Sequence, residues 1–205
     1  MNAHIGKRAY FCQRKEWNIM KPKYLSWIFT LAVITVCLCL LPTKAQAASE
    51  SDLTFKLNTD GESYSVSDCN FLASGKLVIP ATYNGKPVTA IGYEAFRGCS
   101  QMTSISIPST VSRIEQGAFW DCTGLTSVVI PKRVTELSIQ LFEGCTSLTT
   151  LTLPKNLKVI RIEALYNTRL MNIYFAGTEA QWAAVTVEEA NHELDFATVH
   201  YEYKE

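Results

Sequence analysis

The stretch that decides the fold runs from Met102 to Cys122 and reads MTSISIPSTVSRIEQGAFWDC. After two further residues the pattern returns between Leu125 and Cys145 as LTSVVIPKRVTELSIQLFEGC. Apolar residues, proline, phenylalanine and cysteine recur in the same order, shifted by 23 residues. Self-similarity at a fixed period of roughly 20–50 residues is the signature of stacked repeats. The sequence therefore predicts a solenoid, in which each coil contacts only its neighbours.

The 23-residue period extends through the middle of the chain in several columns. An insertion, YNGKP at residues 83–87, interrupts the register once and predicts a turn. A single coil buries too few apolar side chains to offset the ordering of its backbone, so the columns must stack to fold. The columns include Ile91, Ile114, Leu137 and Ile160; Phe96, Phe119 and Phe142; Cys99, Cys122 and Cys145; and Met102, Leu125, Leu148 and Met171.

Each coil divides into two predicted parts. The alternation of residues 102–107, closed by Pro108, predicts a short strand. The looser spacing of residues 114–119 predicts a short helical or 3₁₀ return turn. The expected fold is an α/β repeat solenoid with short parallel strands, and β-rich caps are expected at both ends. Residues 53–66 alternate around Asp60-Gly61, which predicts a hairpin; Thr178 and Gln181 have capping-box spacing; and residues 197–203 predict a last strand.

The unit with its proline after the strand and its Ala-Phe-x-x-Cys turn resembles the BspA-like leucine-rich repeats of bacterial surface proteins. The resemblance covers residues 52–205 and implies a right-handed superhelix that binds other proteins. Leu165 and Thr168 depart from the phenylalanine and cysteine columns, so we expect their coil to be the last complete one. The predicted organisation is an N-terminal extension and signal peptide (1–47), an N-terminal cap (48–76), the repeats (77–172) and a C-terminal cap (173–205).

The N-terminal segment predicts export. Lys21 and Lys23 precede an apolar run from Tyr24 to Leu41, and Ala45-Gln46-Ala47 follows, in the order of a signal peptide. An uncleaved membrane-spanning helix is the competing interpretation and is the one membrane contact the sequence allows. From residue 48 onward the chain has 12 basic and 18 acidic side chains, a net charge of −6, which argues against nucleic acid as a partner. We therefore expect a secreted or extracellular cell-surface protein.

The sequence offers little catalytic equipment. After residue 47 there are two histidines, His192 and His200, and no phosphate-binding loop, nucleophile elbow or zinc-ligand spacing. We expect no enzyme activity, cofactor or metal site. Two alternatives stay open: an enzyme or targeting module that acts on surface polymers through the C-terminal cap, and disulfides within the cysteine column.

Two groups of residues are candidates for binding extracellular or host proteins, or surface glycans. The first is a small, uncharged face on the predicted strands, since alternate strand residues point outward. The second is the position after the repeat phenylalanine, where the residue type changes from coil to coil and includes an aromatic side chain beside an arginine. The first group comprises Thr103, Ser106, Thr126, Thr149 and Thr152, with Ser104, Ser127 and Thr150 as the alternatives to Thr103, Thr126 and Thr149, and the second comprises Trp120, Arg97 and Glu143.

Overall fold

The computed structural model describes residues 50–204. The predicted signal peptide, its cleavage site and the competing membrane helix lie outside this range. Within it, no helix has the length and apolar character required to span a bilayer.

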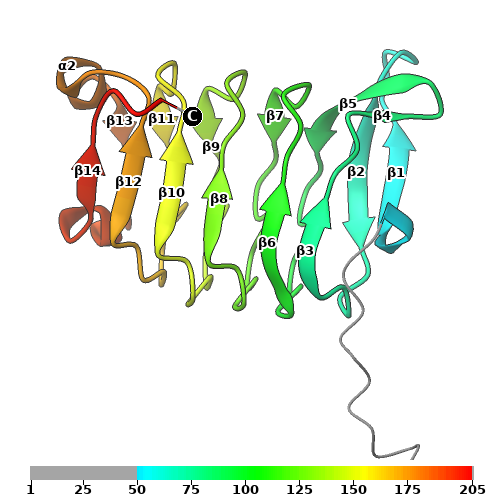
Figure 1. Ribbon diagram of the computed structural model, residues 1–205, viewed down its shortest axis with the longest axis horizontal. Coiled ribbons are helices and arrows are strands. Elements are labelled where there is room, and N and C mark those ends of the chain that lie inside the picture. Colours follow the sequence, from blue (N-terminus) through cyan, green and yellow to red (C-terminus); the bar gives the residue numbers. More distant parts are fainter. Residues whose placement is uncertain (1–49, 205) are drawn as a thin grey trace, which may run out of the picture. The chain divides into compact units, whose positions relative to one another are not determined.

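The main sheet consists of six parallel strands that lie side by side with the same direction (Figure 1). Their spatial order is β14-β12-β10-β8-β6-β3, so each inner strand pairs with the strand one coil before and the strand one coil after, and β14 and β3 are the edges. Neighbours are in register with the repeat: Leu151 on β10 lies between Val128 and Ile173. The strands are β3 (Gly75–Val78), β6 (Met102–Ser106), β8 (Ser127–Val129), β10 (Thr150–Leu153), β12 (Asn172–Phe175) and β14 (Thr198–His200).

A second set of strands lies on the other side of the core and completes each coil. They belong to two smaller sheets, in which β5 pairs in parallel with β2 and β7, and β11 pairs in parallel with β9 and β13. The chain alternates between the main sheet and this second set, which makes a β-solenoid of about six turns. These strands are β2 (Tyr64–Cys69), β5 (Lys86–Ile91), β7 (Arg113–Ile114), β9 (Glu136–Leu137), β11 (Val159–Ile160) and β13 (Thr186–Val187).

The return segments between the repeat coils are turns, which corrects the prediction of helical or 3₁₀ return turns. The N–H of Phe119 donates to the carbonyl of Leu141 in the next coil at 3.0 Å, and that of Asp121 donates to Glu143 at 2.8 Å. The N–H groups between them bond within their own turn, as Trp120 does to Gly117 at 2.9 Å. Because every second N–H is used by the neighbouring coil, the turn cannot continue as a helix.

A left-handed backbone position recurs in every return turn. Gly98, Asp121, Gly144 and Asn167 lie 23 residues apart and have φ values of 73°, 55°, 73° and 59°. Glycine adopts this conformation without steric cost, and Asp and Asn tolerate it better than other side chains do. The turns therefore keep one backbone shape even though the residue type changes.

The core between the two sets of strands contains the predicted columns with one exception: Met171, expected beside Met102, Leu125 and Leu148, is 61% exposed, and Leu170 is buried in its coil. The rings of Phe96, Phe119 and Phe142 are fully buried and stack at centroid distances of 5.2 and 5.4 Å, which confirms that this column is structural. Beside them, the thiol of Cys122 donates to the carbonyl of Phe96 and that of Cys145 to the carbonyl of Phe119, both at 3.0 Å.

The described cysteines are free and buried. Cys69, which the repeat pattern places outside the column, also has its thiol next to that of Cys99, and this contact raises the pKa of Cys69. The pKa of Cys122 is raised in the same way by Cys145 and by burial. Thiols held in the neutral form, such as those of Cys69 and Cys122, are poor nucleophiles and poor metal ligands, whereas the contact with Cys69 lowers the pKa of Cys99.

The N-terminal end of the stack contains two hairpins. β1 (Leu53–Leu57) pairs antiparallel with β2, as the Asp60-Gly61 signal predicts, after a short 3₁₀ helix at Glu50–Asp52. β4 (Thr82–Tyr83) pairs antiparallel with β5 around the predicted turn at Asn84-Gly85.

The C-terminal segment continues the coils beyond the one that contains Leu165. β12 leads through α2 (Glu179–Ala183), β13 and a 3₁₀ helix at His192–Asp195 into β14, and both strand sets gain one more parallel pair. The predicted capping box at Thr178 and Gln181 is present. Buried Asn191 accepts the N–H of Leu165 at 3.0 Å, where earlier coils use a backbone carbonyl. The side-chain amide of Asn191 thus supplies the hydrogen-bond acceptor that the backbone of a following repeat supplies in the earlier coils.

Candidate functional site

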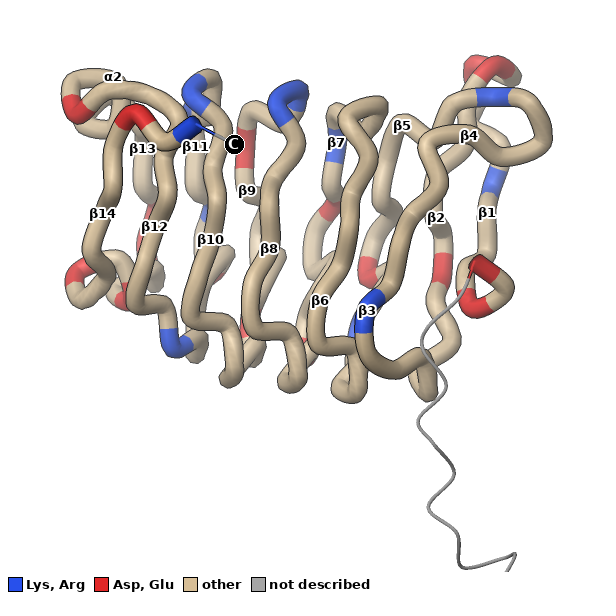
Figure 2. The backbone as a smooth tube through the Cα atoms, viewed as in Figure 1, with Lys and Arg blue, Asp and Glu red and all other residues tan. Residues whose placement is uncertain are grey.

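The outer surface of the main sheet is the most regular surface of the described chain. Ile105, Val128 and Leu151 point into the core, so their neighbours along each strand point outward. Strands β6, β8, β10 and β12 carry no charged residue, as Figure 2 shows. The outward side chains, here called the sheet face, are Ser104, Ser106, Ser127, Val129, Thr150, Thr152, Asn172, Tyr174, Thr198 and His200.

The predicted strand residues have two different positions. Ser106 and Thr152 belong to the sheet face, and Thr103 is exposed on β6. Thr126 and Thr149 precede β8 and β10, and their hydroxyls donate to the carbonyls of Thr103 and Thr126 at 3.1 and 3.4 Å. These two hydroxyls therefore link successive coils.

An aromatic cluster ends the sheet face at its C-terminal side. The ring of Tyr174 stacks on His200 at 4.7 Å and contacts Tyr203 at 4.9 Å. The His200 ring nitrogen Nε2 lies 3.1 Å from Oδ1 of Asn172. The 23-residue period does not predict this cluster, because Tyr174 and His200 are 26 residues apart and follow none of its columns. The parallel pairing of β12 with β14 is what brings them together.

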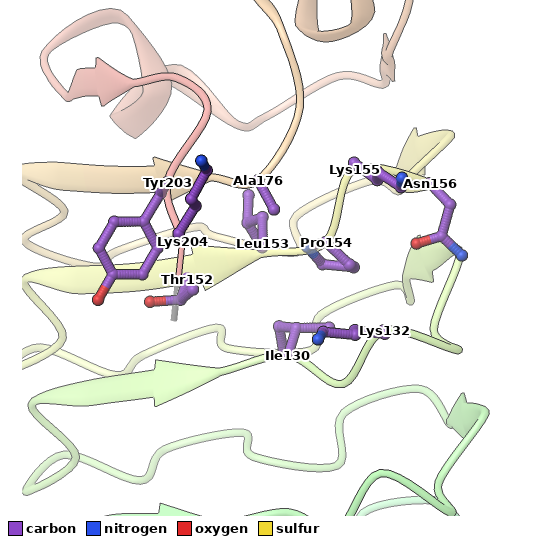
Figure 3. Close-up of a pocket in the computed structure, with 10 residues that line it drawn as sticks. All are labelled: Ile130, Lys132, Thr152, Leu153, Pro154, Lys155, Asn156, Ala176, Tyr203 and Lys204. Atoms are coloured by element: carbon purple, nitrogen blue, oxygen red, sulfur yellow. The ribbon is translucent and has the colours of Figure 1, made fainter.

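A pocket of about 590 Å³ adjoins the aromatic cluster, at the carboxyl ends of β8, β10 and β12. Thr152 of the sheet face and Tyr203 of the aromatic cluster form part of its wall, as Figure 3 shows. The described residues that line it are Ile130, Lys132, Thr152, Leu153, Pro154, Lys155, Asn156, Ala176, Tyr203 and Lys204.

The second predicted group lies on the return turns rather than on the sheet face. The guanidinium of Arg97 lies over the ring of Trp120, 4.0 Å from its centroid. Glu94 holds the guanidinium in an ion pair at 2.8 Å and raises the pKa of Arg97. The structure thus brings Arg97 and Trp120 together as expected, but the indole is half-buried and one of its faces is covered.

Glu143, the third member of that group, has a buried carboxylate oxygen, Oε2, with no hydrogen-bond partner among the described residues. Burial, assisted by the nearby carboxylate of Glu163, raises the pKa of Glu143. A carboxyl group whose pKa is higher in the folded than in the unfolded state favours folding while it is protonated. This contribution is complete below the unfolded pKa of about 4.3 and is lost as the pH rises through the pKa of the folded state. At neutral pH the ionised side chain therefore destabilises the fold.

We expect Glu143→Gln to raise the melting temperature at pH 7 by roughly 1–3 °C and to give no gain near pH 4, because the neutral amide removes the buried charge. Thermal unfolding at both pH values measures the difference. Glu62→Gln, at an exposed position in the first hairpin, is the control and should show no such pH dependence. An equal effect of Glu143→Gln at both pH values would contradict the assignment.

Known proteins share both the repeat and the fold. The model of the BspA-type leucine-rich repeat region matches residues 63–183 with six copies. A leucine-rich repeat protein from Bacteroides ovatus is 31% identical over 73% of this chain, with a TM-score of 0.59, and the chain covers 39% of that protein's length. A leucine-rich repeat protein from T. pallidum is 21% identical, with a TM-score of 0.51; the match covers 63% of this chain and 71% of that one. No curated protein sequence matches. The chain belongs to the BspA-type leucine-rich repeat family.

Proposed function

We propose that this chain is an exported, non-enzymatic recognition protein that binds other proteins at or outside the cell surface, and that the sheet face is its contact surface. The observation that carries the proposal is the sheet face itself, an ordered surface free of charge on four adjacent strands, within residues 48–205, whose net charge is −6. Depletion of charge with exposed aromatic side chains is the composition found at the centre of protein interfaces.

The side chains of the sheet face are available to a partner. Within residues 50–204 the hydroxyls of Ser106 and Thr152 hydrogen-bond to no side chain, so each can donate and accept. Val129 is 47% exposed and supplies apolar area between them. The aromatic cluster adds rigid rings at one end, which lose little conformational entropy on binding.

The group of Trp120, Arg97 and Glu143 is a second proposed contact. A partner that stacks on the covered face of Trp120 must first displace Arg97 from its contact with the indole and from Glu94. The sheet face requires no such rearrangement, which is why we assign it the principal role.

The test places a charge in the middle of the sheet face. The chain is immobilised, retained extracellular proteins are identified, and the affinity of one purified partner is measured for the wild type and for Val129→Arg. We expect Kd to rise at least about tenfold, because an unpaired guanidinium would be buried in the interface. Thr135→Arg, at an exposed position before β9, is the matched control and should leave Kd unchanged. Equal Kd values for both variants would exclude the sheet face.

A further inference from the structure

Three lysines gather at the pocket beside the aromatic cluster. Lys132 and Lys155 occupy the same repeat position, directly after the proline that ends each strand, and Lys204 joins them from the C-terminal segment (Figure 3). The described lining residues include no aspartate or glutamate, and none of the three lysines forms an ion pair within residues 50–204. In a chain with a net charge of −6 after residue 47, this is a local reversal of charge.

The remaining lining residues restrict the chemistry of a ligand. Exposed Ala176 supplies apolar surface, with buried Leu153 and Pro154 in the same wall, and Tyr203 lies on the side opposite Lys155. Ammonium groups donate hydrogen bonds and accept none, so three of the polar groups in the lining require an acceptor on the ligand. A neutral sugar, whose hydroxyls also need acceptors, is a poorer match than a carboxylate attached to a short hydrocarbon chain.

We propose that this pocket binds the carboxylate side chains of an acidic polypeptide segment, which continues from it onto the sheet face. The inference rests on the proposed function, since it names the chemistry that a protein partner must present. Thr152 belongs both to the pocket and to the sheet face, and Tyr203 joins the pocket to the aromatic cluster. One extended segment can therefore place glutamate or aspartate at Lys132 and Lys155 and an aliphatic side chain against Ala176, the exposed apolar residue of the lining.

The experiment uses the 15N-labelled chain and three small probes in low salt: the peptide Ac-Glu-Leu-Glu-NH2, its neutral analogue Ac-Gln-Leu-Gln-NH2, and glucuronate. We expect the acidic peptide to shift the amide signals of residues that line the pocket, and the neutral peptide to shift them at least about fivefold less at equal concentration. Added salt should weaken the binding of the acidic peptide, because the Debye length falls from about 10 Å at 0.1 M to about 3 Å at 1 M and the charges are screened from one another.

The double variant Lys132→Gln/Lys155→Gln keeps both side chains polar and shortens each by one bond while removing their charge. We expect this variant to bind the acidic peptide at least about fivefold more weakly than the wild type does. The matched control Lys76→Gln/Lys158→Gln removes the same charge from exposed positions outside the pocket and should bind like the wild type.

Three outcomes would overturn the inference: equal binding of the acidic and neutral peptides, equal weakening in both double variants, or binding of glucuronate with no response to the acidic peptide. The last result would make the pocket a site for acidic sugars. These outcomes are independent of Val129→Arg, so a failure at the pocket leaves the test of the sheet face intact, and the reverse also holds.

Discussion

Phe119→Ala is expected to lower the free energy of unfolding by about 3–5 kcal/mol, since the ring is completely buried and its removal leaves a cavity. The position is central to the stack, because Phe119 contacts both Phe96 and Phe142. Each aromatic pair adds roughly 0.5–1.5 kcal/mol beyond burial. In a solenoid, stability is a sum of coil and neighbour interactions, so one truncation weakens two interfaces.

Denaturant unfolding of the wild type and variant measures this loss. Phe119→Leu should cost less, since Leu165 occupies the same column in a later coil and is equally buried. Phe196→Ala, at a ring that is 83% exposed, should change the free energy by less than about 0.5 kcal/mol. An unchanged midpoint for Phe119→Ala would show that the column does not hold the coils together.

Gly124→Ala is expected to cost about 3 kcal/mol, although the substitution adds a single methyl group. A Cβ atom at Gly124 would clash with the carbonyl oxygen of Ser100 and lie 3.2 Å from that of Met102. Both obstacles are backbone atoms of the preceding coil, so relief requires the two coils to move apart. Insertion of a methylene into a tight site typically costs about 1–3 kcal/mol, and the upper end applies where no side chain can rotate away.

Gly98→Ala is the matched control for this prediction. Gly98 has a φ of +73°, which is unfavourable for alanine, but a Cβ atom there would have no neighbouring atom within 4 Å. Alanine at this position therefore causes backbone strain and no steric clash. We expect a cost of about 1–2 kcal/mol at Gly98, clearly below that at Gly124. A greater loss at Gly98 than at Gly124, measured by denaturant unfolding, would contradict the proposed contact.

Periodicity was informative where side chains are buried. The columns of Ile114, Phe119 and Cys122 are all in the core, since a coil that stacks on identical neighbours must present the same apolar residue at the same place. The same pattern was misleading for the return turn. Residues 114–119 have a spacing that resembles a helix, but their alternate N–H groups bond to the next coil, which a local pattern cannot reveal.

Gly124 illustrates a second limit of the pattern. Its column contains Gln101 and Ser147 in the neighbouring coils, so the sequence gives no sign that a side chain is excluded. The approach of the Ser100 carbonyl is a contact between coils, and only the packed structure shows it.

The sequence by itself determined the stacked-coil fold, the identity of the core columns and the placement of Ser106 and Thr152 on an exposed strand face. These properties recur in every coil, and because each coil must bury the same kind of side chain at the same position, the sequence repeats the residue type. Only the tertiary structure decided the aromatic cluster of Tyr174, His200 and Tyr203 and the lysine-lined pocket beside it. Both features depend on how the irregular C-terminal segment pairs with β12. Such a surface occurs once in the chain, between segments that do not follow the repeat, so no period in the sequence predicts it.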